Sequence, residues 1–407
     1  MQKNVLLIHG GGPTAVINGS LYGAVTEAKK DADVKHIYAA IGGTGGFLKE
    51  KLRDLKDVPD ETLKLLLQTP GSAIGTSRDE LEAPEYERMT QLLKKHEINC
   101  VLMNGGNGTM DTCGKLAGAC EKAGADVSVM GIPKTMDNDI AVTDHSPGYG
   151  SAARYVAEST RELAADIKGL PIHVCVMETS GRNAGWITAA AALAAQTFRA
   201  GQGLEKAVFE EGVSCENDES AADLIYLPER PFSEEEFLTD VSNLLKKKSG
   251  ILVVASEGLK NKDGGQIVEP IFKTGRATYF GDVSAYLANL VIKKLSYKAR
   301  GEKPGLLGRA SIHLQSKVDL EEAILAGRVA CAEVLKGTSG KMVAFKRLST
   351  QPYQVETFLV DIDEVMLTEK TMPASFINER GNGVTQEFIE WCRPLLGAEL
   401  PEMISFQ

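Results

Sequence analysis

Short runs of apolar residues alternate along the chain with longer stretches that have the periodicity of helices. The run NVLLIH at Asn4–His9 predicts a buried strand, and glycines and then a helix over Ile17–Lys30 follow it. Further strands are predicted at His36–Ile41, Glu97–Asn104, Asp126–Ile132, Ile172–Glu178 and Ile251–Glu257. Apolar runs of this length, each followed by a helix, indicate parallel strands buried on both faces. The predicted fold class is therefore α/β, with doubly wound, mostly parallel sheets.

The remaining segments complete this outline. A helix is predicted after Ala323 and a strand at Lys341–Phe345, whereas Glu210–Ser220 and Lys260–Gly265 are polar and predict surface loops. The apolar stretch Thr188–Ala200 is shorter than the ~18 residues of a membrane-spanning helix and predicts a buried helix instead.

Composition narrows the class of protein. A chain of 407 residues has room for two or three domains, and its net charge of −10 argues against a general nucleic-acid binder. No apolar stretch is long enough to predict a membrane-spanning helix, so no membrane partner is expected. The seven cysteines have no metal-ligand spacing, so we expect reduced, buried thiols and a cytoplasmic protein.

Three turns that contain glycine offer places where a phosphate could bind. They are Gly10–Thr14 (GGGPT), Gly71–Arg78 (GSAIGTSR) and Gly105–Thr109 (GGNGT). Glycine lets the backbone approach a phosphate without a Cβ, and a following helix N-terminus adds N–H donors and partial positive charge. None matches the Walker A or GxGxxG pattern. Each turn alone is equally compatible with a turn that binds nothing, but three in one chain favour phosphate binding.

A cluster of charged residues follows the predicted strand Asp126–Ile132. Phosphoryl transfer needs a carboxylate that orients or deprotonates the attacking hydroxyl, cations that neutralise the phosphoryl oxygens, and an oxygen ligand for magnesium. Lys134, Asp137 and Asp139 in the stretch PKTMDNDI supply these residue types. The alternative is a turn whose side chains only cap backbone N–H groups.

These motifs resemble the A-type phosphofructokinase family, and most closely its pyrophosphate-dependent and long ATP-dependent branch. The motifs that carry the resemblance are GGGPTAVIN, GTSR, GGNGT, PKTMDNDI, TDHSPGYGSAARY, METSGRNAGW and SEG, in the family's order over most of residues 1–310. The last hundred residues match more weakly. The resemblance implies a soluble glycolytic kinase with two Rossmann-like domains and an active site in the cleft between them.

The resemblance also implies a role for each matching residue. Asp137 is implied as the general base toward the sugar hydroxyl, and Lys134 as the lysine that stabilises the transition state in pyrophosphate users. The other implied residues are the phosphoryl clamps Arg78 and Arg182; the donor contacts Gly11, Gly12, Arg78, Gly106, Gly108 and Thr109; the sugar contacts Thr135, Asp137, Asp139, Ser180, Gly181, Arg182, Glu257, Lys303 and Arg309; and the Mg²⁺ ligands Asn107 and Asp139.

Two positions point to different phosphoryl donors. Pyrophosphate users typically have an aspartate at the position of Gly108, whose carboxylate would repel the α-phosphate of ATP by about 4 kcal/mol, or nearly a thousandfold in affinity. Gly108 removes that obstacle, whereas Lys134 favours pyrophosphate without excluding ATP. Asn107 departs from the aspartate usual in ATP users and is a weaker magnesium ligand. We favour ATP as donor, with pyrophosphate as the alternative.

The acceptor site departs further from the family pattern. His173 stands where an arginine is common, Ser180 where a methionine is usual, and LGRASIH replaces the QRGG motif. Lys303 and Arg309 could still bind a phosphate, although losing bidentate arginines is not conservative. We expect transfer to the 1-hydroxyl of fructose 6-phosphate, and a different sugar acceptor is the alternative.

The resemblance implies domain boundaries and an assembly. A donor domain is expected at residues 1–148 with about 310–360, and a sugar domain at 149–309 with about 361–407. A homodimer or homotetramer is expected. A non-catalytic relative would be expected to lack Asp137 or the glycine turns, and a nicotinamide-dependent dehydrogenase would need GxGxxG after the first strand; neither pattern is seen.

Overall fold

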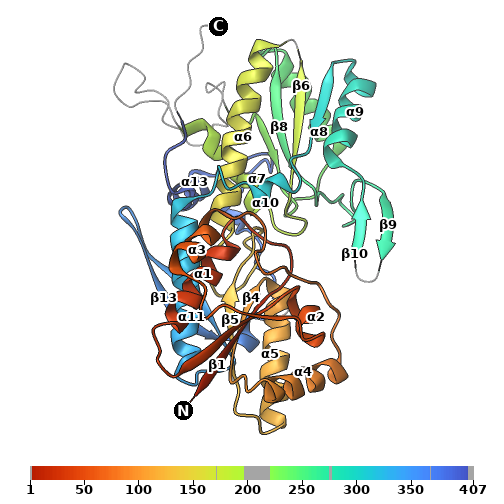
Figure 1. Cartoon of the computed structure of the whole chain (residues 1–407). Coiled ribbons are helices and arrows are strands. Elements are labelled where there is room, and N and C mark those ends of the chain that lie inside the picture. The colour runs from red at the N-terminus through yellow and green to blue at the C-terminus, as the bar shows by residue number, and fades with distance from the viewer. Residues whose placement is uncertain (1, 171, 197–220, 275–276, 367, 402–407) are drawn as a thin grey trace. The chain divides into compact units, whose positions relative to one another are not determined.

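A computed structural model of the chain describes residues 2–170, 172–196, 221–274, 277–366 and 368–401. The chain divides into two compact units, unit 1 at Met1–Ser151 with Arg309–Lys370 and unit 2 at Ala152–Gly308 with Thr371–Gln407. The crossings lie at 151/152, 308/309 and 370/371, against implied positions of 148/149, 309/310 and 360/361. Each unit contains its own sheet (Figure 1).

Unit 1 is built on a seven-stranded sheet of order β13-β12-β5-β4-β1-β2-β3. Its strands are β1 (Lys3–His9), β2 (Val34–Ala40), β3 (Leu52–Asp54), β4 (Cys100–Gly105), β5 (Ser128–Pro133), β12 (Lys341–Thr350) and β13 (Tyr353–Asp361). The pairs from β2 through β1, β4 and β5 to β12 are parallel, while β3 and β13 add antiparallel edges. The sheet is therefore mostly parallel, as predicted.

Helices cover both faces of this sheet because the central strands are apolar on both sides. Those of unit 1 are α1 (Ile17–Ala28), α2 (Gly43–Leu48), α3 (Asp60–Lys64), α4 (Ala83–Lys95), α5 (Asn107–Lys122), α11 (Lys317–Leu335), α12 (Ile362–Val365) and the 3₁₀ helix η1 (Leu65–Gln68). Val5 and Leu7 of β1 join a core with α1 and α11, whereas Leu6 and Ile8 join a second core with α4 and α5. This division of one strand between two cores is the doubly wound arrangement.

Unit 2 has a smaller, four-stranded parallel sheet of order β11-β6-β8-β7. Its strands are β6 (Val174–Thr179), β7 (Leu224–Tyr226), β8 (Ile251–Ser256) and β11 (Ala299–Glu302), with a hairpin of β9 (Pro270–Thr274) and β10 (Ala277–Phe280) beside it in sequence. Its helices are α7 (Trp186–Ala189), η2 (Ala190–Gln196), α8 (Glu234–Leu245), α9 (Val283–Leu295), η3 (Ala374–Phe376), α13 (Gln386–Cys392) and η4 (Arg393–Leu396), while α6 (Tyr149–Gly169) and α10 (Leu307–Ala310) span the unit boundaries. Helices α8 and α9 cover an apolar core over β6 and β8.

The predicted strands and their helices are confirmed, with shifts of a few residues at their ends. Strand β12 continues past the predicted Lys341–Phe345 into a hairpin with β13 that the apolar pattern did not indicate. The predicted loop Glu210–Ser220 and the end of the predicted helix Thr188–Ala200 lie outside the described residues. The six described cysteines are buried and free, and no described helix is long and apolar enough to span a bilayer.

Helices α1 and α11 approach each other so closely that glycine is required at their contact. A Cβ on Gly23 would lie 2.1 Å from the carbonyl oxygen of Ile324, and one on Gly327 would lie 2.1 Å from that of Ser20. Because both obstacles are backbone atoms, the helices would have to separate to accept a side chain. This contact fixes α11, which begins shortly after Arg309, against the N-terminal part of unit 1.

A side chain at Gly327 should therefore destabilise unit 1, because it would push α1 and α11 apart. We expect Gly327→Ala to lower the free energy of unfolding by about 1–3 kcal/mol, the usual cost of overpacking a core. Gly118→Ala in α5 is the matched control, because a Cβ there meets nothing within 4 Å, and it should stabilise by roughly 0.5–1 kcal/mol. Urea denaturation of both variants measures the two changes. Equal effects of the two substitutions would contradict the close approach of α1 and α11.

Candidate functional site: the glycine loops and the charged turn

The first and third glycine loops leave the neighbouring strands β1 and β4 and close on one threonine. The N–H of Gly10 donates to the carbonyl oxygen of Asn104 at 2.9 Å. A Cβ on Gly10 or on Gly105 would lie 2.2 or 2.1 Å from Oγ1 of Thr109. Both positions therefore need glycine for the two loops to meet.

The second loop lies along the first although it is distant in sequence. The N–H of Gly11 donates to the carbonyl oxygen of Ser77 at 2.9 Å, and Oγ1 of Thr76 donates to the carbonyl oxygen of Gly11 at 2.8 Å. Gly11 has a φ of 74°, a conformation that L side chains rarely adopt. The structure thus brings all three predicted loops together in unit 1, at the carboxyl ends of parallel strands.

Three cationic side chains gather around Gly12. Lys134 is only 3% exposed, and its Nζ donates to the carbonyl oxygen of Gly12 at 2.6 Å. A Cβ on Gly12 would lie 2.5 Å from Nη1 of Arg309 and 3.4 Å from Nη2 of Arg78. Arg309 was expected to contact the sugar, but its guanidinium lies beside Gly12 of the first loop.

The electrostatics of this cluster favour an anion. Burial lowers the pKa of Lys134 to about 8, against the opposing effect of Asp137 and Asp139. Burial and the charge of Arg78 likewise lower the pKa of Arg309. Three cations face only two carboxylates, so a bound phosphate would relieve the repulsion among the three cations. This local excess of positive charge stands out in a chain of net charge −10.

The turn that carries the two carboxylates is shaped by its own side chains. Oγ1 of Thr135 accepts from the N–H of Asp137 at 3.1 Å and donates to Oδ1 of Asp139 at 2.8 Å. Asn138 has a φ of 53°, in the left-handed region that asparagine tolerates better than most residues, and it is fully buried. Asp137 and Asp139, on either side of it, stay partly exposed.

Asn107 and Asp139, the predicted magnesium ligands, lie side by side. Nδ2 of Asn107 donates to Oδ2 of Asp139 at 3.1 Å, which leaves Oδ1 of Asn107 buried without a partner among the described residues. An orphaned amide oxygen beside a carboxylate suits a hard cation. No cluster of three or more His, Cys, Asp or Glu side chains occurs in the described parts of the chain. The arrangement therefore fits Mg²⁺, which takes one or two protein ligands and phosphate oxygens for the rest.

The predicted sugar contacts of unit 2 follow the ends of β6 and β8. The carbonyl oxygen of Gly181 accepts from Oγ of Ser256 at 2.8 Å, and the N–H of Glu257 donates to the carbonyl oxygen of Thr179 at 2.9 Å. Ser180, Gly181, Arg182 and Glu257 therefore belong to two neighbouring strand ends. Burial raises the pKa of Glu257, although the charge of Arg182 opposes this.

Lys303 and Arg309, which were both predicted to bind a phosphate of the sugar, belong to different units. Lys303 lies in unit 2, where its Nζ pairs with Oε1 of Glu178 at 2.9 Å and also with Asp282, whereas Arg309 lies in unit 1. His173 accepts from the N–H of Lys298 at 3.3 Å and packs its ring against Tyr297. These contacts favour the interpretation of His173 as an inert histidine.

Sequence reasoning missed Lys370, which holds the turn from the far end of unit 1. Its N–H donates to the carbonyl oxygen of Asp139 at 2.8 Å, and its buried Nζ donates to the carbonyl oxygens of Thr143 and Asp144 at 3.0 and 2.9 Å and to Oδ1 of Asn138 at 3.4 Å. Lys370 and Thr143 are 227 residues apart, and nothing in the local sequence links them.

The fold and the charges together define an α/β protein whose strand ends carry glycine loops and an excess of positive charge, which suits a phosphorylated anion. A family model described as Phosphofructokinase matches residues 4–315. The chain therefore belongs to the phosphofructokinase family.

Individual relatives extend over almost the whole chain. A Pyrophosphate--fructose 6-phosphate 1-phosphotransferase of Xanthomonas campestris is 35% identical to this chain. The matched region spans 98% of this chain and 92% of the relative's length. A sulfofructose kinase of Alkalicoccus urumqiensis is 33% identical, and the match spans 95% of this chain and 93% of the relative. The crystal structure of a pyrophosphate-dependent phosphofructokinase from Nitrosospira multiformis is similar with a TM-score of 0.86, at 33% identity and coverage of 99% and 94%.

The lowered pKa of Lys134 predicts how anion affinity changes with pH. The ammonium group is charged below about pH 8 and neutral above it, so affinity for inorganic pyrophosphate should weaken as pH rises through that value. Lys134→Met should bind about ten to a hundred times more weakly at pH 7, the usual value of a charge-assisted hydrogen bond, and should lack the change near pH 8. Calorimetric titration measures both, with the exposed Lys115→Met as control. A pH dependence that persists in Lys134→Met would assign it to another group.

Proposed function

We propose that the chain transfers a phosphoryl group from pyrophosphate to the 1-hydroxyl of fructose 6-phosphate. The observation that carries the proposal is the convergence of three glycine loops with Lys134, Asp137 and Asp139 at one set of strand ends. The similarity to named pyrophosphate-dependent enzymes extends over 98–99% of the chain. These relatives support the pyrophosphate alternative of the sequence analysis better than its ATP reading.

The residues of unit 1 fit the steps of this reaction. Asp137 takes the proton of the 1-hydroxyl as the sugar oxygen bonds to phosphorus, and the bridging P–O bond of pyrophosphate breaks to release inorganic phosphate. Lys134, Arg78 and Arg309 neutralise the charge of the transferring group and the leaving phosphate. In unit 2, Glu257 accepts a hydrogen bond from the sugar and Arg182 serves as a further phosphoryl clamp.

We assign the cofactor as Mg²⁺, held by Asp139 and by the orphaned amide oxygen of Asn107 together with phosphate oxygens. When bound, the ion would neutralise negative charge on the donor. The proposal also includes a homodimer or homotetramer in the cytoplasm without nucleic-acid or membrane partners, on the strength of the family resemblance.

A second candidate is ATP-dependent phosphorylation of sulfofructose. The similarity to a sulfofructose kinase at 33% identity favours this acceptor. It is also favoured because Lys303, predicted to bind a phosphate, is already paired with the carboxylates of Glu178 and Asp282. The open surroundings of Gly108 favour ATP, since a Cβ there meets nothing within 4 Å. Steady-state turnover with each donor against each acceptor separates the two candidates.

Removing the general base should slow turnover strongly with any donor. We expect Asp137→Asn to lower kcat by about 10²–10⁴, the usual contribution of a positioned base, while the affinity for pyrophosphate changes little. Asp60→Asn, which alters an exposed carboxylate of the same unit, is the control. Full turnover in Asp137→Asn would overturn the assignment of the turn as the catalytic centre.

Introducing a carboxylate at position 108 tests the donor. Gly108 is exposed in the first turn of α5, where an acidic side chain is favourable, so Gly108→Asp should fold normally. We expect ATP-supported turnover to fall by roughly a thousandfold through charge repulsion, while pyrophosphate-supported turnover is retained or rises. Gly108→Asn provides a neutral side chain of the same size. If the Asp and Asn variants use ATP equally well, charge at this position does not select the donor.

A further inference from the structure

The motif TDHSPGYGSAARY has no role in the function proposed above. Its first part nevertheless supports the charged turn that contains Lys134, Asp137 and Asp139. In the Thr143–Gly148 loop, the N–H of Ser146 donates to Oδ1 of Asn138 at 3.1 Å, and the carbonyl oxygen of Pro147 accepts from the N–H of Thr135 at 3.1 Å. Thr135 and Asn138 enclose Asp137 in the sequence. The position of Asp137 therefore depends on where this loop is held.

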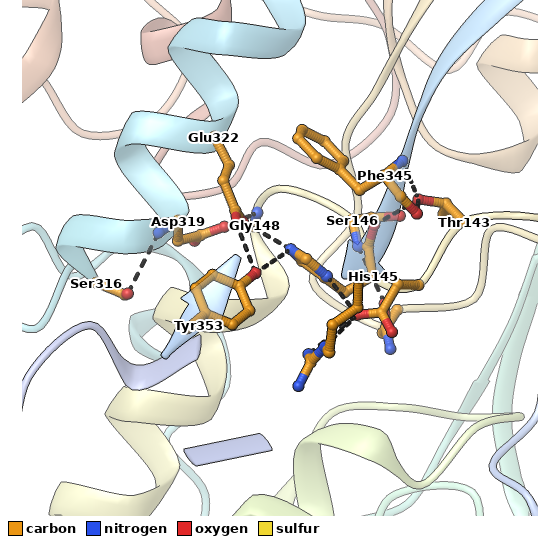
Figure 2. Close-up of polar contacts among 12 residues, drawn as sticks. Thr143, His145, Ser146, Gly148, Ser316, Asp319, Glu322, Phe345 and Tyr353 are labelled. Atoms are coloured by element: carbon orange, nitrogen blue, oxygen red, sulfur yellow. Dashed lines mark hydrogen bonds and ion pairs between the residues drawn. The ribbon is translucent and has the colours of Figure 1, made fainter. Parts of the chain in front are cut away.

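A histidine at the centre of the loop lies between two carboxylates. His145 is 1% exposed, its Nδ1 is 2.8 Å from Oδ2 of Asp144, and its Nε2 is 2.6 Å from Oε2 of Glu322 on α11 (Figure 2). Ionised carboxylates can only accept hydrogen bonds, so both ring nitrogens must carry a proton for both bonds to form. This geometry defines an imidazolium.

The groups around His145 balance its charge. Oε1 of Glu322 accepts from the hydroxyl of Tyr353 on β13 at 2.6 Å, and Oδ2 of Asp144 accepts from Nη2 of Arg347 on β12 at 3.0 Å. The ring of Phe345, also on β12, stacks on the imidazole with 5.5 Å between centroids. Asp144 and Glu322 are thus faced by the cations of His145 and Arg347.

Two further charged groups approach the same loop. Nζ of Lys370 donates to the carbonyl oxygens of Thr143 and Asp144, and Asp319 on α11 accepts from the N–H groups of Gly148 and Ser151 at 2.8 and 2.9 Å. Figure 2 shows Asp319 and Glu322 on the same helix, one beside Gly148 and the other at the imidazole. Helix α11 therefore anchors the loop at two points, and the second anchor requires His145.

Burial alone would lower the pKa of His145, but the charges and hydrogen bonds of Glu322 and Asp144 raise it to about 9. The ring is therefore charged at neutral pH. The stabilisation by this charged ring is complete below about pH 6.5, the pKa of an unperturbed histidine. It is lost as the pH rises through about 9. A neutral ring has one N–H and leaves one carboxylate facing a lone pair.

We propose that His145 is a positioning residue for phosphoryl transfer, because its imidazolium ties the Thr143–Gly148 loop to α11 and so fixes the turn that presents Asp137. The inference rests on the role of Asp137 in the proposed function. A histidine that only stabilised the core would change the free energy of unfolding and leave the kcat of the folded enzyme unaltered. Misplacement of a base by about 1 Å, in contrast, costs up to a hundredfold in rate.

His145→Gln in the full chain tests this inference. We expect kcat to fall by tenfold or more while KM for pyrophosphate stays within about threefold, since the loop supports the base rather than the cations around Gly12. His36→Gln is the matched control, because His36 forms an exposed pair with Asp54 at 2.6 Å, and it should leave kcat unchanged. A kcat within twofold of the unsubstituted enzyme in folded His145→Gln would overturn the inference.

Glu322→Gln provides a second test that does not require His145→Gln to fold. Removing one carboxylate should lower the pH at which the His145 ring loses its proton. The ratio of kcat between Glu322→Gln and the unsubstituted enzyme should therefore fall in the pH range where only the variant has a neutral ring, because the loss of the Lys134 charge affects both enzymes and cancels in the ratio. NMR of histidine-labelled enzyme reports the rings directly, and the signal whose midpoint moves in Glu322→Gln belongs to His145. If every histidine ring is neutral at pH 7, or if the ratio of kcat between Glu322→Gln and the unsubstituted enzyme does not fall in that pH range, the inference is overturned. Full turnover of Asp137→Asn would overturn the proposed function instead, and the NMR midpoint near pH 9 would be unaffected.

Discussion

The buried ammonium group of Lys134 is the interaction on which the geometry of the unit 1 strand ends depends. Its Nζ donates to the carbonyl oxygen of Gly12 at 2.6 Å, and its backbone N–H donates to the carbonyl oxygen of Gly105 at 3.0 Å. One residue thus joins the first loop, the third loop and the charged turn. Removing a cation from water is costly, and Asp137 and Asp139 offset only part of that cost. The site is therefore prepared for an anion before any ligand arrives.

Much of the fold could be predicted because parallel strands buried on both faces leave a strong apolar signal. Every residue of β4, β6 and β8 is buried, and each of the three was predicted from its run of apolar residues. Hairpin β12–β13 was missed beyond Phe345, since its outer part alternates between half-buried and exposed positions and resembles a loop. Strand β3, with three residues that are not buried, left no pattern to recognise.

The site could be predicted only where its chemistry is local in sequence. The charged turn and the glycine loops are contiguous motifs, and the structure brings them together as expected. Arg309 was assigned to the sugar by its resemblance alone, and its approach to Gly12 required the fold. Lys370 and Glu322 act on the turn and its supporting loop from more than a hundred residues away. Such contacts depend on how α11 and the last strands return to the sheet, which no local pattern encodes.

The split composition of unit 1 also constrains how the nascent chain can fold. Its first strand starts at Lys3, but α11, which covers the core over Val5 and Leu7, is made only after residue 316, when most of unit 2 has already been synthesised. During translation the apolar face over Val5 and Leu7, against which α1 also packs, therefore stays incompletely covered until α11 is made. That interval is when exposed strands and faces aggregate most readily. The first core of unit 1 is thus complete only when α11 docks against α1, which leaves the nascent chain exposed to aggregation until then.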